Sequence, residues 1–246
     1  MFLYQTREVA FFSENSVKKP VFYTELAYPI ALLLLALGTA LTAYGGFGIS
    51  MVVAPAYILH LRVSELLPFF SFGVAEYTLQ AVILLLLMLI LRKVKLTYLL
   101  SFGAAVLYGF ALDGAMRLTS LLPVYPALRI SLYVMGALIC CAAIALLFYS
   151  YLPPEAYEMF VKEVAGTWKK PFPTVKTVYD VVSLILAVVL SLLFFGKLRG
   201  IGMGTVICTF AYGPIIHLFQ KMLEKLFRFE DRFPWRKFFD ESEEKP

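Results

Sequence analysis

Three acidic side chains and one histidine lie inside long apolar runs of this sequence. They are Glu76, Asp113, Asp180 and His217. An unpaired carboxylate in hydrocarbon costs several kcal/mol, so we expect such groups to face a protein interior rather than lipid. Carboxyl and imidazole groups in that setting bind and release protons or cations, or form the polar walls of a solute path. The chemistry that the sequence indicates is therefore proton or cation handling, in two clusters.

Local pairing is an alternative for two of the acids. Asp113 lies four residues before Arg117, and Lys176 lies four residues before Asp180. Pairs at this spacing meet on the surface of one helix. For His217, near the end of a helix, the alternatives are a proton relay and simple contact with the membrane interface.

Glu76 has no base within reach in its own helix. Its neighbour one turn on is the neutral Gln80. Glu76 and Gln80 are thus our first candidates for a substrate or ion path, and Tyr108 and Tyr212 are added because they hold matching places in a repeat described below.

The composition places the chain among membrane proteins. Apolar residues make up 61% and charged residues only 16%, whereas charge runs near a quarter in soluble domains. The apolar residues form unbroken runs, which predicts an all-α polytopic bundle rather than the alternating strands of a barrel. Six spans are expected, at about 28–44, 68–91, 96–116 and 127–151 and as two spans within 174–218. Short interfacial helices are expected in the long loops, around 51–67 and 155–173.

The two halves of the chain correspond to each other. A shift of 104 places Glu76 on Asp180, Lys95 on Arg199, Tyr108-Gly109 on Tyr212-Gly213, and Asp113 on His217. A shift of 98 places Gly38 on Gly136, Pro55 on Pro153, and Glu65 on Glu163. We expect a terminal segment at 1–27, three-helix repeats at 28–126 and 127–220, and a basic, aromatic tail at 221–246. With three spans in each half, the second repeat is inverted, as in many transporters.

Basic residues predict the orientation. Of the 22 Lys and Arg, 17 fall in the N-terminal segment, the 92–95 turn, the 152–176 segment and the tail, and 5 fall on the opposite side. The positive-inside rule then places both termini in the cytoplasm of a multi-pass inner (plasma) membrane protein. Because the bases flank spans, they indicate contact with the lipid bilayer and no binding of nucleic acid.

Several chemistries are not expected. Cys140, Cys141 and Cys208 lie in apolar runs without disulfide or metal spacing, so we read them as small residues at helix contacts. We expect no cofactor, no metal and no enzymatic activity, since no zinc or nucleophile motif is present. Small residues and prolines instead indicate packing and loop geometry: Gly38, Pro55, Gly202, Gly204, Thr205, Gly213 and Pro214. The helix that starts near Gly202 also offers a weak anion site as an alternative.

The motif Gly202-x-Gly204-Thr205-Val206, followed by Tyr212-Gly213-Pro214 in the last span, resembles the YczE-like bacterial membrane proteins, relatives of the YitT group. In that family a G-x-G-T run and a Gly-Pro step mark the last helix, and an acidic residue in the preceding helix matches Asp180. Pro55-Ala56 stands where the family has Pro-Trp. The resemblance implies a bacterial inner-membrane protein and no particular activity.

Two functions follow as hypotheses. The first is a secondary transporter or exporter of a small, unidentified solute. The second is a non-transporting accessory factor, or a substrate-binding subunit, that acts with a partner membrane protein. Association with further copies of this chain in a homo-oligomer is the alternative to such a partner. A polar interior path between the levels of Glu76 and Asp180 would favour the first.

Overall fold

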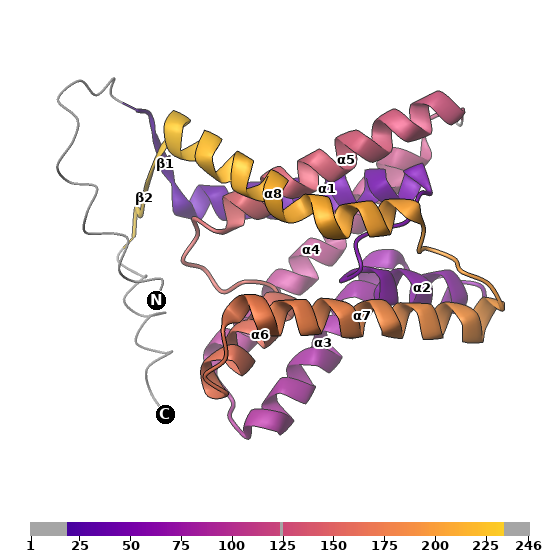
Figure 1. Cartoon of the computed structure of the whole chain (residues 1–246), viewed down its shortest axis with the longest axis horizontal. Helices are drawn as coiled ribbons and strands as arrows, with labels where there is room; N and C mark the ends of the chain where they lie inside the picture. The colour runs from indigo at the N-terminus through magenta and orange to yellow at the C-terminus, as the bar shows by residue number, and fades with distance from the viewer. Residues whose placement is uncertain (1–18, 124, 234–246) are drawn as a thin grey trace.

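A computed structural model describes residues 19–123 and 125–233. Within these residues the chain forms eight helices and two short strands (Figure 1). In chain order they are β1 (Val21–Tyr23), α1 (Thr24–Gly45), α2 (Ala54–Val63), α3 (Phe72–Leu91), α4 (Leu96–Ser120), α5 (Pro126–Leu147), α6 (Ala156–Thr167), α7 (Phe172–Phe195), α8 (Met203–Leu226) and β2 (Arg228–Glu230).

Six of the helices are long and apolar enough to cross a membrane, namely α1, α3, α4, α5, α7 and α8. Each has at least 20 residues, which at 1.5 Å per residue matches a hydrocarbon layer of about 30 Å. The predicted all-α, six-span membrane class is confirmed. The predicted short helices in the two long loops are α2 and α6.

Local signals place the helix ends. Ser71 caps α3 by accepting a hydrogen bond from the backbone N–H of Val74 at 3.2 Å. Pro126 begins α5, where its missing N–H costs nothing. Gly46 and Gly196 follow α1 and α7 with φ of 75° and 64°, a left-handed geometry that stops a helix.

The helix pair that packs most extensively is α1 with α5. A Cβ built on Gly38 would lie 2.6 Å from Cys140 Sγ and 2.8 Å from the Gly136 carbonyl oxygen, and one built on Gly136 would lie 2.7 Å from the Gly38 carbonyl oxygen. Only glycine allows this approach, so Gly38 lies at a close helix contact. Gly38 and Gly136, which correspond in the sequence repeat, touch each other.

The short helices lie against the spans. α2 packs on α3 and α7, and α6 packs on α3, α4 and α7. Pro55 lies in the first turn of α2 and is buried together with Ala54 and Ala56. The first turns of both short helices are thus inside the bundle, which a helix lying flat on a membrane surface would not require.

One end of the molecule carries a small parallel sheet. β1 pairs with β2 in the register Val21 with Arg228 and Tyr23 with Glu230. Glu25, at the start of α1, accepts hydrogen bonds from the backbone N–H groups of Arg232 at 3.0 Å and Phe233 at 2.9 Å. α1 begins at Thr24, before the predicted segment boundary at 27, and α8 runs past the one at 221 to Leu226, before the strand that pairs with β1. Predictions for 1–18 and 234–246 fall outside the described residues.

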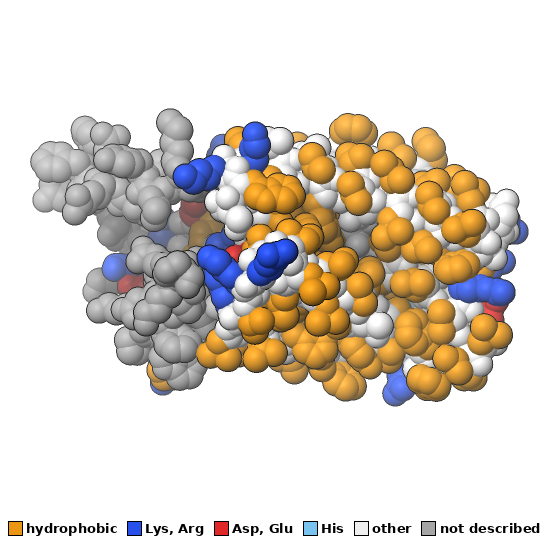
Figure 2. Space-filling view, turned by 90° about the horizontal axis from the view of Figure 1, so that it is seen from below, with side chains coloured by type: hydrophobic (Ala, Val, Ile, Leu, Met, Phe, Trp, Pro, Cys, Tyr) orange, Lys and Arg blue, Asp and Glu red, His pale blue; other side chains and the backbone are white. Residues whose placement is uncertain are grey.

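The surface agrees with a bilayer environment. Figure 2 shows hydrophobic side chains over the middle of the visible face and Lys and Arg side chains toward its two ends. Large apolar side chains on α3, α7 and α8 are exposed, among them Leu89, Leu193 and Phe210. α8 is the least covered of the six spans.

Candidate functional site

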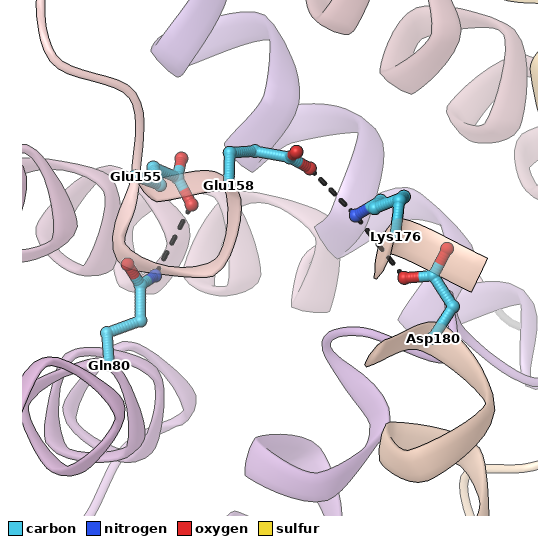
Figure 3. Close-up of polar contacts among 5 residues, drawn as sticks. All are labelled: Gln80, Glu155, Glu158, Lys176 and Asp180. Atoms are coloured by element: carbon cyan, nitrogen blue, oxygen red, sulfur yellow. Dashed lines mark hydrogen bonds and ion pairs between the residues drawn. The ribbon is translucent and has the colours of Figure 1, made fainter. Parts of the chain in front are cut away.

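Two carboxyl groups meet inside the bundle. Glu76, from the second turn of α3, is fully buried, and Glu155, the residue before α6, is 8% exposed. The side-chain amide of Gln80 lies between them, with Nε2 at 3.5 Å from Glu76 Oε2 and 3.3 Å from Glu155 Oε2 (the second contact is drawn in Figure 3). Gln80 Oε1 in turn accepts the backbone N–H of Ala156 at 3.1 Å. We call Glu76, Gln80 and Glu155 the carboxyl pair site.

Tyr157 completes the site from α6. Its hydroxyl donates to Glu76 Oε2 at 2.6 Å. The second oxygens, Glu76 Oε1 and Glu155 Oε1, are buried and have no hydrogen-bond partner among the described residues. Both carboxyl groups therefore keep an acceptor open for a proton or another ligand, at a place where an empty acceptor is costly.

The loop before α6 places Glu155 at this depth. Pro153 and Pro154 interrupt helical structure after α5. The Pro153 carbonyl oxygen accepts from the Tyr28 hydroxyl at 2.8 Å, and the Pro154 carbonyl oxygen accepts from Ser101 Oγ at 2.6 Å. Irregular backbone at membrane depth is tolerated only where protein groups satisfy it, and side chains of α1 and α4 do so here.

Burial dominates the electrostatics of Glu155. It raises the pKa of this carboxyl from 4.5 to about 8, and the charges of Glu76 and Glu158 act in the same direction, while the hydrogen bond from Gln80 opposes them. The pKa of the Tyr157 phenol is raised well above 10 for the same reason. Neutral pH therefore lies close to the pKa of Glu155, so a small change around this carboxyl can release its proton.

Asp180 belongs to a neighbouring ion-pair cluster. Lys176 Nζ lies 2.9 Å from Glu158 Oε1 and 3.3 Å from Asp180 Oδ1 (Figure 3). The local alternative considered for Asp180, an i,i+4 pair with Lys176, is thus present. The cluster also joins α6 to α7, because Glu158 lies on α6.

Asp113 holds the start of α3 against α4. It accepts from Ser71 Oγ and from the backbone N–H of Gly73, the latter at 2.7 Å. The local pairing with Arg117 that the sequence allowed is not found among the described ion pairs. A cavity of about 140 Å³ lies beside Asp113, lined also by His60 and Arg117.

Two of the remaining path candidates, Tyr108 and Tyr212, lie near the same thiol, Cys140, and the third lies elsewhere. Tyr108 is buried and donates to Thr39 Oγ1 at 3.1 Å, close enough to Glu76 and Glu155 to feel their charge. Tyr212 is half-buried beside the thiols of α5 and α8. His217 is exposed on α8, so the structure does not bring it to the carboxyl pair site.

The glycine-rich turn before α8 has a structural role. Gly202 caps the helix and its N–H donates to Thr205 Oγ1 at 3.3 Å. The N–H of Gly204 donates to the Phe47 carbonyl oxygen at 2.9 Å, and a Cβ on Gly204 would collide with the Tyr133 hydroxyl. Further along α8, Gly213 and Pro214 are exposed.

Glu155 and Tyr157 were not among the predicted site residues. Both lie in a segment whose many charged residues indicate a surface helix. Pro153-Pro154 directly before Glu155 indicates a break in helical structure after the fourth span, but it does not indicate that the loop enters the bundle. No group of three metal-binding side chains exists within the described residues.

Comparison with known proteins places residues 22–221 in one family, described as a family of unknown function (DUF6198). No curated protein and no solved structure matches the chain. The resemblance to the YczE-like proteins stays a prediction.

Proposed function

The chain belongs to this family of unknown function, and we propose that it is a secondary transporter of a small solute, driven by protonation of the carboxyl pair site. The observation that carries the proposal is the pairing of Glu76 and Glu155. Two buried acids, one from a span and one from a loop that enters the bundle, share one neutral amide and leave two acceptors open.

Two negative charges at this place would be costly. Like charges in a low-dielectric interior raise each other's proton affinity, so the pair favours a state that holds at least one proton. Losing that proton creates repulsion across Gln80. A ligand or conformation that changes the separation of the two acids is therefore coupled to proton binding.

The surrounding groups do not neutralise the pair. Lys176, a base on α7, is already bound by Glu158 and Asp180. The other titratable groups that interact with the pair are the acid Glu158 and phenols contributed by α1, α4, α6 and α7: Tyr28, Tyr108, Tyr157 and Tyr179. Neutral phenols can donate hydrogen bonds to a carboxylate, or line a path for a solute, without cancelling its charge.

The order of helix contacts supports an inverted repeat. α1 packs on α4 as α5 packs on α8, and α2 packs on α3 and α7 as α6 packs on α7 and α3. Contact between the corresponding residues Gly38 and Gly136 is what a two-fold axis between α1 and α5 would produce. Transporters with this architecture place their binding sites near the repeat interface.

Purified protein in liposomes tests the proposal. Difference infrared spectroscopy across a pH step should show a carboxylic C=O band that is lost in both Glu76→Gln and Glu155→Gln. Driven by a proton gradient, a screen of small solutes should show flux with wild type and none with either variant. Glu230→Gln is the matched control, because Glu230 lies on β2 in contact with Arg228. An unchanged band in both site variants would remove the proton site.

An accessory role is the second candidate, and it is favoured by the open face of α8. This span is apolar but almost uncovered within the described residues, so a partner helix or a second copy could pack there. If that role is correct, the purified protein alone shows no flux with any solute, and a bulky Phe210→Trp change on this face alters co-purification with a membrane partner. Glu76→Gln leaves such binding intact.

A further inference from the structure

We propose that two ion pairs at opposite ends of the bundle form alternately: Lys95 with Glu163 in this structure, and Arg199 with Glu65 in a second conformation. The proposal rests on the proposed transport function and deepens it by naming the gates. The sequence repeat relates the two pairs, since a shift of 104 takes Lys95 to Arg199 and a shift of 98 takes Glu65 to Glu163.

The first pair is formed. Lys95 Nζ lies 2.8 Å from Glu163 Oε1 and 3.0 Å from Oε2, and the two side chains are only 15% and 12% exposed. Lys95 directly precedes α4 and Glu163 lies in α6. The pair therefore fastens the α3–α4 turn to the short helix and closes this end of the bundle.

The corresponding pair is open. Glu65 instead contacts Arg62 at 2.6 Å, an exposed i,i+3 contact just after α2. Arg199 is exposed and stacks on Phe195 with its guanidinium 4.7 Å from the ring centre, and it forms no ion pair within the described chain. Exposed i,i+3 pairs contribute little to stability, so Glu65 can exchange partners cheaply.

A cavity occupies the space beside the open pair. It measures about 270 Å³ and is lined by Arg199, Tyr57, Leu61 and the glycine loop after α1. Leu61 lies near the end of α2, four residues before Glu65, so Arg199 and the helical turn that leads to Glu65 line the same cavity. The cavity beside Asp113 is lined by neither Lys95 nor Glu163.

The spans show the same asymmetry as the ion pairs. α3 and α4 pack so closely that a Cβ on Gly109 would lie 2.8 Å from the Gly73 carbonyl oxygen and 2.9 Å from the Tyr77 ring. The corresponding Gly213 on α8 faces open space. Figure 1 shows α7 and α8 running apart after their shared turn, and they are not among the helix pairs that pack along each other in the described structure.

Closure of the second half follows from this difference. If α8 approaches α7 as α4 approaches α3, Gly213 supplies the close contact and Arg199 moves toward α2, where Glu65 lies. The cavity would close, and the two-fold relation of the halves would open the Lys95 end. A solute path between the carboxyl pair site and each side would then be open at one end at a time.

Paired cysteines test the exchange. In a background with Cys140, Cys141 and Cys208 replaced by serine or alanine, one variant carries Lys95→Cys with Glu163→Cys and another carries Glu65→Cys with Arg199→Cys. A short thiol cross-linker should join both pairs in folded protein. In the four-cysteine protein, locking the first pair should abolish cross-linking of the second, and the reverse. Lys95→Cys with Arg199→Cys is the control pair, which should not join because the two positions lie at opposite ends of the bundle.

The outcomes separate the gates from transport. If both pairs cross-link within one molecule, or if Glu65→Cys never joins Arg199→Cys, the exchange is wrong. If exclusive cross-linking holds but no solute flux is found in liposomes, the gates stand and the transport function fails. Should cysteines at the paired positions prevent folding, charge reversal in the same background gives the same answer. Glu65→Lys with Arg199→Glu should preserve the exchange, measured by the distance between spin labels on Leu61→Cys and Lys197→Cys. Either charge change alone should suppress the closed population.

Discussion

The hydroxyl of Tyr157 donates a 2.6 Å hydrogen bond to Glu76, which joins a helix of the second half to a membrane span of the first. The contact lies where both partners are buried. The sequence alone does not reveal this contact, because 81 residues separate the two positions.

Removal of this hydroxyl should weaken the bundle most when Glu76 is ionised. A hydrogen bond to a charged group contributes about 1.5–3 kcal/mol, so Tyr157→Phe should lower the melting temperature at high pH and less at low pH. Thermal unfolding in detergent at both pH values measures this. The exposed Tyr125 supplies the control, since Tyr125→Phe should change neither. Equal losses at both pH values would indicate packing rather than hydrogen bonding.

Stability should fall as pH rises through the range set by Glu155. Its pKa is raised from 4.5 to about 8 in the folded protein, so between these values the folded state holds a proton that the unfolded chain has lost. The stabilisation is complete below 4.5, declines by at most about 1.4 kcal/mol per pH unit, and levels off above 8.

Glu155→Gln should flatten this part of the pH profile, because the amide is neutral throughout. Chemical or thermal unfolding at a series of pH values gives the comparison, with Glu230→Gln as a surface control. A variant profile as steep as that of wild type would assign the pH dependence to other groups.

Two glycines at corresponding positions should respond differently to the same change. Gly109→Ala places a methyl group against Gly73 and Tyr77 and should cost about 1–3 kcal/mol of overpacking. Gly213→Ala meets open space and should be neutral or slightly stabilising, since alanine favours helix. Melting temperatures of the two variants decide this. A large loss at Gly213 would mean that α8 is covered by a partner in the purified protein.

The orientation stays a prediction that reporter fusions can test. With both termini cytoplasmic, a reporter at the C-terminus and one inserted at Pro123, in the α4–α5 loop, should report opposite sides of the membrane. The same side for both would contradict three spans, α5, α7 and α8, between this loop and the C-terminus.

The sequence was sufficient for the spans and for Glu76. Uninterrupted apolar runs define helices by length alone, and a lone carboxylate in such a run has to be buried. The depth of Glu155 was not predictable, because it depends on two proline carbonyls finding partners on α1 and α4. The contacts of Asp113 were missed for a related reason. Donors at the start of α3 compete with Arg117 for the carboxylate, and the packing of α3 against α4 determines which donor binds it.

The strand pair at the ends of the chain has a consequence for biosynthesis. β1 leaves the ribosome before any span, yet its only strand partner in the described structure, β2, is made after the sixth. β1 therefore stays without its strand partner until the whole bundle has been inserted into the membrane. The strand pair can form only after all six spans have been made. A chain that stops before Arg228 therefore leaves β1 with an open strand edge, which quality-control proteases can recognise.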